Sequence, residues 1–150
     1  MDSDFANMSL PEYFKALKKF FEVDIKFNGY LGMSVEELAK GYARLRIPFK
    51  AELVGDPFRP ALHGGVISSL LDTVGGIAAF TAVRPGDTLA TVDLRVDYLR
   101  PGRLEDIVGV GEIVRIGNRV AVSDIVAYQD DPKKPVASGK GVYNIKRSGD

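Results

Sequence analysis

The feature that most constrains the fold is an unusually apolar helical segment in the middle of the chain. Residues 62–80 read LHGGVISSLLDTVGGIAAF, and from about Gly65 to Thr81 apolar side chains recur at helical spacing. They form two rows that cover most of the circumference: Val66, Leu70, Val74 and Ile77 in one, and Ile67, Leu71, Val74 and Ala78 in the other. A helix of this kind is buried on nearly all sides. The rest of the chain must therefore wrap around it.

One narrow strip of this helix is polar. It consists of Ser68, Ser69, Asp72 and Thr73, and Asp72 is the only charged residue in roughly four turns. A buried carboxylate costs several kcal/mol unless a partner satisfies it. Asp72 is therefore the first functional candidate. The alternative is a structural acid that only bonds the neighbouring serines or an adjacent strand.

Composition excludes several classes of function. The 150 residues suit one domain, which we expect to span residues 1–150 with residues 1–28 as an N-terminal helical extension. Twenty Lys and Arg balance twenty Asp and Glu, so we expect neither a nucleic-acid nor a membrane partner. With no cysteine and one histidine, no metal or other cofactor is expected. No signal-like or membrane-length apolar run is present, which predicts a cytoplasmic protein.

The segments around the central helix are predicted to form one further helix and a sheet. The helix covers residues 9–22, and two strands follow it at residues 29–38 and 41–49. Four more strands follow the central helix, at residues 88–98, 107–116, 120–128 and 135–145. In the first of these, Ala90, Val92, Leu94, Val96 and Tyr98 alternate and are expected to share one face. This order predicts an α+β domain in which the sheet wraps the central helix.

The start of the central helix is a second candidate for chemistry. Helix N-termini present free N–H groups and a partial positive charge. Gly64 and Gly65 have no Cβ, so a ligand oxygen could approach these two amides closely. Such a donor pair suits a carbonyl oxygen that becomes an oxyanion, while Asp72 could act as a base or nucleophile. The two glycines could equally be a tight entry into the helix, and His63 a structural histidine.

Gly64 and Asp72 cannot act on the same carbonyl group within one chain. They are eight residues apart, which is about 12 Å along a helix at 1.5 Å per residue. Two chains related by a two-fold axis, with their central helices antiparallel, could bring Gly64 of one chain near Asp72 of the other. The spacing therefore predicts a homodimer with two equivalent sites.

The run from His63 to Ile67 (HGGVI), with Asp72 nine residues after the histidine, resembles the PaaI-like branch of the hotdog-fold acyl-CoA thioesterases. The similarity covers residues 29–145 and includes the TVDL sequence at residues 91–94 and the YLRP sequence at residues 98–101. The resemblance implies a hotdog fold, in which a curved antiparallel sheet wraps one long helix, and dimers that often pair into tetramers. It also implies hydrolysis of an acyl-CoA thioester without a metal, so that coenzyme A is part of the substrate.

The resemblance also assigns roles to residues. Asp72 matches the acid that attacks the thioester or activates water, and Gly64 matches the backbone donor that polarises the thioester carbonyl, with His63 beside it. Thr91 falls where the family places a hydroxyl group that positions the water or the acid. Pro57 is a departure, because relatives often carry an Asn there and proline offers no comparable donor. That assistance must come from elsewhere, such as a neighbouring loop residue, or be absent.

Substrate-binding residues are expected around these groups. Gly65 and Ser68 lie beside the proposed reaction centre, and the acyl pocket is expected to be lined by Ile67, Leu71 and residues of the N-terminal helix. The phosphates of coenzyme A require cations, for which the candidates at strand ends and turns are Arg100, Arg103 and Arg119, with Arg115 and Lys140. The alternative for each arginine is an ordinary solvated side chain.

Two other functions remain open from the sequence. A hotdog dehydratase would need a histidine placed to move a proton at the β-carbon, with an acid at a longer spacing. Here the only histidine directly precedes the two glycines. A non-catalytic acyl-CoA-binding or regulatory hotdog protein would share both fold and ligand with a thioesterase.

Overall fold

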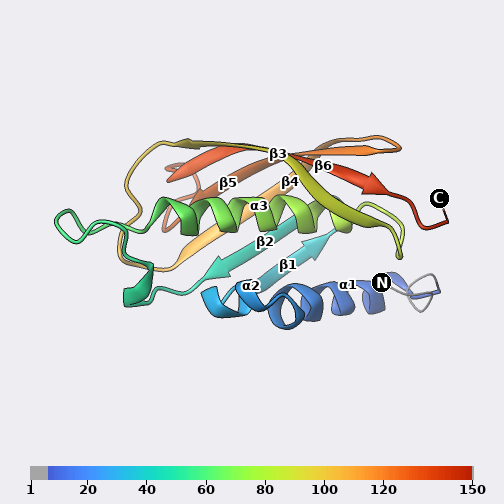
Figure 1. Ribbon diagram of the computed structural model, residues 1–150, viewed down its shortest axis with the longest axis horizontal. Helices are drawn as coiled ribbons and strands as arrows, with labels where there is room; N and C mark the ends of the chain where they lie inside the picture. Colours follow the sequence, from blue (N-terminus) through green and yellow to red (C-terminus); the bar gives the residue numbers. More distant parts are fainter. Residues whose placement is uncertain (1–6, 150) are drawn as a thin grey trace.

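The computed structural model describes residues 7–149 and places one long helix against one sheet (Figure 1). The helix, α3 (Gly64–Phe80), packs on six antiparallel strands in the order β1-β2-β4-β5-β6-β3. Their bounds are β1 (Ser34–Ala39), β2 (Tyr42–Ile47), β3 (Thr88–Tyr98), β4 (Ile107–Ile116), β5 (Val120–Tyr128) and β6 (Ala137–Lys146). This arrangement confirms the predicted α+β hotdog fold.

The central helix has the predicted burial pattern. It begins and ends one residue earlier than the periodicity indicated, and Leu70, Leu71, Val74 and Ile77 have no exposed surface. Each such side chain contributes about 1.5–3 kcal/mol through burial. The polar strip of α3 is only half-buried, so the helix leaves this strip open on one side. Within residues 7–149, no helix combines the length and the apolar character needed to cross a membrane.

Glycines allow α3 to lie unusually close to the sheet. A Cβ atom on Gly111 of β4 would lie 2.6 Å from the carbonyl oxygen of Val74, and one on Gly75 would lie 2.3 Å from the Tyr143 hydroxyl. Any larger residue at either position would force the helix and sheet apart. The position of Asp72 relative to β6 therefore depends on these two glycines.

The N-terminal segment differs from its prediction. Ser9 and Glu12 form a capping box at its start, but α1 (Leu10–Lys19) is followed by a π-helix (Phe20–Asp24) and then by α2 (Lys26–Leu31). The prediction of a strand from residue 29 was wrong at its start. Gly32, with φ of +72°, ends α2 in the left-handed conformation, and the strand begins only after it. Residues 1–6 of the predicted extension lie outside the described residues.

The prediction that alternate residues of β3 share one face was also wrong. Thr91 pairs with Tyr143 and Asp93 pairs with Val142, so that Val92 is an extra residue in a β-bulge. Before the bulge, the partly buried Leu89 and the exposed Thr91 face α3, whereas after it the partly buried Leu94 and Val96 do so. The bulge is therefore the reason that Thr91 points toward the helix.

Candidate active site

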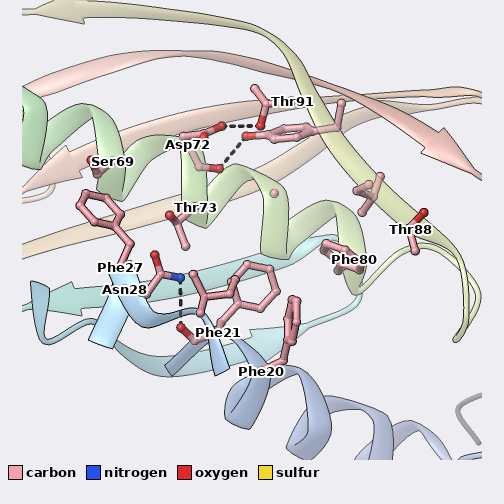
Figure 2. Close-up of a pocket in the computed structure, with 14 residues that line it drawn as sticks. Phe20, Phe21, Phe27, Asn28, Ser69, Asp72, Thr73, Phe80, Thr88 and Thr91 are labelled. Atoms are coloured by element: carbon pink, nitrogen blue, oxygen red, sulfur yellow. Dashed lines mark hydrogen bonds between the residues drawn. The ribbon is translucent and has the colours of Figure 1, made fainter. Parts of the chain in front are cut away.

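A cavity of about 550 Å³ lies beside the polar strip of α3 (Figure 2). One wall comes from the N-terminal segment, as expected, and the other from α3, β3 and β6. Its apolar lining consists of Phe20, Phe21, Ile25, Phe27, Gly76, Phe80 and Leu89, and its polar lining of Asn28, Ser69, Asp72, Thr73, Thr88, Thr91 and Tyr143. The cavity therefore has a largely aromatic wall on one side and Asp72 on the other.

Asp72 is held by groups from two strands of the sheet. The Thr91 hydroxyl donates to the Asp72 carboxylate Oδ1 at 2.8 Å, and the Tyr143 hydroxyl donates to the Asp72 backbone carbonyl at 2.9 Å. Figure 2 marks the bond between Thr91 and Asp72 with a dashed line. Asp72 is half-buried, so its carboxylate meets the cavity rather than the core. The sequence had placed a lone acid here, and the structure supplies its partner.

Tyr143 was not among the residues selected from the sequence. Burial raises the pKa of its hydroxyl, and the nearby negative charge of Asp72 raises it further, so Tyr143 stays a hydrogen-bond donor. The sequence predicted a strand at residues 135–145, which contains Tyr143. The strand pattern did not indicate which turn of the helix Tyr143 would contact, because the register between a helix and a sheet depends on tertiary packing.

The N-terminus of α3 offers one free amide rather than the expected pair. The His63 ring caps the helix, since its Nδ1 accepts the Gly65 N–H at 2.8 Å. The Gly64 N–H has no acceptor among residues 7–149. Tyr98 donates from its hydroxyl to the Gly64 carbonyl at 3.0 Å and so fixes this turn. Gly64 is therefore the remaining donor for a ligand oxygen, and His63 holds the geometry.

Gly64 and Asp72 face different hollows of the same chain. Gly64 borders a second hollow of about 420 Å³, together with Ile67, Tyr98 and Arg100. Asp72 does not line that hollow, and Gly64 does not line the larger cavity. A single chain therefore does not present both groups to one ligand, as the distance along the helix had indicated.

The other residues of α3 that were expected to bind substrate do not lie in one place. Ile67 lines the second hollow rather than the aromatic cavity. Leu71 is completely buried in the core and does not contact the cavity in which we expected it. Ser68 is half-buried and donates to the Gly65 carbonyl at 3.2 Å.

The candidate cations do not form one cluster within a chain. Arg100 borders both the second hollow and a third hollow that Arg103 and Lys134 also line. Arg103 is already paired with Asp130, and this pairing raises the pKa of the guanidinium. Arg119 lies in the β4–β5 turn, at the opposite end of the sheet.

The loop of residues 54–62 leads into α3 and contains Pro57, the position at which relatives often carry an Asn. Pro57 is exposed, and the nearby Asp56 and Arg59 pair with each other at 3.4 Å. Asp56 also accepts the Phe58 N–H at 2.9 Å. These side chains therefore satisfy one another within the loop of a single chain.

Comparisons with known proteins show the family and the fold of the chain. The sequence profile of the thioesterase superfamily matches residues 60–136. The chain is 31% identical to the medium/long-chain acyl-CoA thioesterase YigI of Escherichia coli, over 93% of this chain and 98% of that protein. A solved protein of Shewanella oneidensis related to the thioesterase superfamily is 31% identical and superposes with a TM-score of 0.81, covering 91% of this chain and 97% of that one. A thioesterase family protein of Silicibacter pomeroyi, 24% identical over 89% of this chain and 97% of its own, shares the fold with the same TM-score.

Proposed function

This chain belongs to the thioesterase superfamily and acts as an acyl-CoA thioesterase, and we propose that it does so at a site built from two copies of the chain. The observation that carries this proposal is the Asp72 carboxylate, bonded to Thr91 at 2.8 Å and open to a largely apolar cavity. A general base and an adjoining space for an apolar acyl group are the two features that thioester hydrolysis needs on one side of the carbonyl.

A second copy of the chain is proposed to contribute Gly64, which contacts the thioester carbonyl from the other side. Within a chain, β3 runs antiparallel to α3, so that Thr91 lies beside Asp72 and Tyr98 lies beside Gly64. β3 is also an edge of the sheet and is available for pairing. An antiparallel pair in which Tyr98 lies opposite the partner's Thr91 places Gly64 level with the partner's Asp72. Both groups then meet one thioester.

The proposed reaction starts with Asp72 as a general base. Asp72 takes a proton from a water molecule whose oxygen attacks the thioester carbonyl carbon, and the negative charge on the carbonyl oxygen is stabilised by the Gly64 N–H of the other chain. The carbon–sulfur bond then breaks. The proton moves from Asp72 to the departing thiolate, which yields free acid and coenzyme A. In the alternative, Asp72 attacks the carbonyl carbon itself and water hydrolyses the resulting anhydride.

The acyl group is proposed to be a medium or long chain. YigI, the relative named above, is a medium/long-chain acyl-CoA thioesterase, and the aromatic wall of the cavity suits an alkyl chain. Arg100 is proposed to meet the phosphates of coenzyme A, because it borders the hollow that also holds Gly64. Association into tetramers and a cytoplasmic location remain predictions from the sequence.

A panel of acyl-CoA esters with short, medium, long and aromatic acyl groups tests the function. We expect release of free thiol, fastest with medium or long chains. Asp72→Asn keeps the shape of the side chain and removes its charge, so kcat should fall by at least about two orders of magnitude with little change in binding. Binding without thiol release by the wild type would instead indicate a regulatory acyl-CoA-binding protein. Full turnover by the variant would remove Asp72 from the mechanism.

A further inference from the structure

Phe58 is the most exposed large apolar side chain among residues 7–149. Its exposed fraction is 93%, whereas the next, Tyr30, reaches 65%. Single exposed apolar residues are common on protein surfaces. Phe58 differs because it lies six residues before Gly64, on the loop that leads directly to the helix N-terminus.

The loop that carries Phe58 is fixed in position by its own hydrogen bonds. Val54 and Leu62 form an isolated β-bridge at its base, and the Gly55 N–H donates to the Ala61 carbonyl at 2.8 Å. At its tip, the carboxylate of Asp56 accepts the Phe58 N–H at 2.9 Å. Figure 1 shows this loop extending outward beyond the N-terminal end of α3. The loop is therefore a preformed projection.

The proposed dimer determines which part of the partner lies next to the loop that carries Phe58. The pairing that sets Tyr98 opposite the partner's Thr91 also sets Arg100 level with the partner's Leu89. Leu89 and Thr88 line the aromatic cavity of their own chain. The base of the loop is tied to the same strand end, because the Leu62 N–H donates to the Gly102 carbonyl at 2.9 Å. In the proposed dimer, the loop therefore lies beside the part of the partner's cavity that Leu89 and Thr88 line.

From this placement we propose that Phe58 of each protomer covers the acyl cavity of a second copy of the chain. The inference rests on the proposed function, since it uses the same two-fold arrangement that unites Gly64 with Asp72. The Phe58 ring adds one more aromatic surface to a cavity whose aromatic wall already holds Phe20 and Phe27. A long acyl chain would contact this ring, and a short one would not reach it. Phe58 is thus a residue that determines acyl-chain specificity from the neighbouring subunit.

A tryptophan at this position tests the placement without measuring activity. The chain contains no tryptophan, so Phe58→Trp creates a single fluorescent reporter. We expect blue-shifted emission in the native protein and a further change when the thioether analogue of dodecanoyl-CoA, which cannot be hydrolysed, is added. Emission typical of a water-exposed indole that the analogue leaves unchanged would overturn the inference.

Kinetics test the consequence for specificity. Phe58→Ala should lower kcat/KM for dodecanoyl-CoA by about tenfold or more while leaving that for butyryl-CoA nearly unchanged. Tyr30→Ala is the matched control, because Tyr30 is also a highly exposed aromatic residue and does not line the cavity. Equal effects of Phe58→Ala on both esters would contradict the inference. A wild-type protein that hydrolyses no acyl-CoA would instead refute the proposed function, and the tryptophan emission would still report on the contact.

Discussion

At the scale of single residues, the site depends on how one carboxylate is oriented. The sequence predicted Asp72 because a lone charge on an apolar helix requires an explanation. The expected burial of Asp72 was only partly right, because its side chain is half-buried. The completely buried acid is Asp87, in the turn after α3. Burial alone would raise the pKa of Asp87, but hydrogen bonds from the Ser148 N–H and the Arg147 guanidinium lower it below its usual range. Burial of an acid is therefore a poor guide to function, and an open cavity beside it is a better one.

The Thr91 hydroxyl provides the first test at this scale. Thr91→Val keeps the shape of the side chain but removes the only side-chain donor to the Asp72 carboxylate among the described residues. We expect kcat to fall by about 10–100-fold, because Asp72 loses the bond that orients it, with KM little changed. Thr91→Ser retains the hydroxyl group and should recover most of the activity in thiol-release assays. Wild-type kcat in the valine variant would show that Thr91 does not orient the acid.

At the scale of elements, the site depends on close contact between α3 and the sheet. Two buried hydroxyls from the sheet donate to carbonyls of this helix: that of Tyr143 in β6 to Asp72 at 2.9 Å, and that of Ser123 in β5 to Gly75 at 3.0 Å. Strands β4 and β5 have the bounds that the alternation predicted. The bulge at Val92 and the π-helix at Phe20–Asp24 were not predictable, because each adds a residue that local patterns do not reveal. Because of these two irregular elements, the side chains of Thr91 and Phe20 line the cavity.

Two neighbouring glycines of α3 test this contact as a matched pair. Gly75→Ala would place a methyl group 2.3 Å from the Tyr143 hydroxyl, so it should destabilise the protein by about 1–3 kcal/mol and displace the group that holds Asp72. Gly76→Ala would place its methyl group 3.4 Å from the same ring, which is an ordinary contact, and should gain up to about 1 kcal/mol from helix propensity. Urea unfolding measures both effects. Equal stability of the two variants would argue against tight packing at Gly75.

At the scale of the whole molecule, the proposed site is divided between the Gly64 region of one chain and the Asp72 region of another. The apolar helix and the strands predicted on either side of it were together sufficient to predict the wrapped sheet, since a sheet that curves around the helix buries most of its surface. The cavity could not be predicted in the same way, because its aromatic wall comes from the N-terminal segment, far from Asp72 in sequence. The separation of Gly64 and Asp72 was predictable, because both lie on one rigid helix.

Mixing two inactive variants tests whether the complete site spans two chains. Gly64→Pro removes the N–H group at the first position of α3, where proline is tolerated, and His63 before it has ψ of 134°, which suits a residue that precedes proline. Asp72→Asn removes the charge. If the variants are unfolded together in equal amounts and refolded, about half of the dimers should be mixed, and each mixed dimer holds one intact site. Thiol release should then recover to about one quarter of the wild-type rate. If Gly64 and Asp72 acted within one chain, every site would lack one of the two groups, and the mixture would stay as inactive as its components.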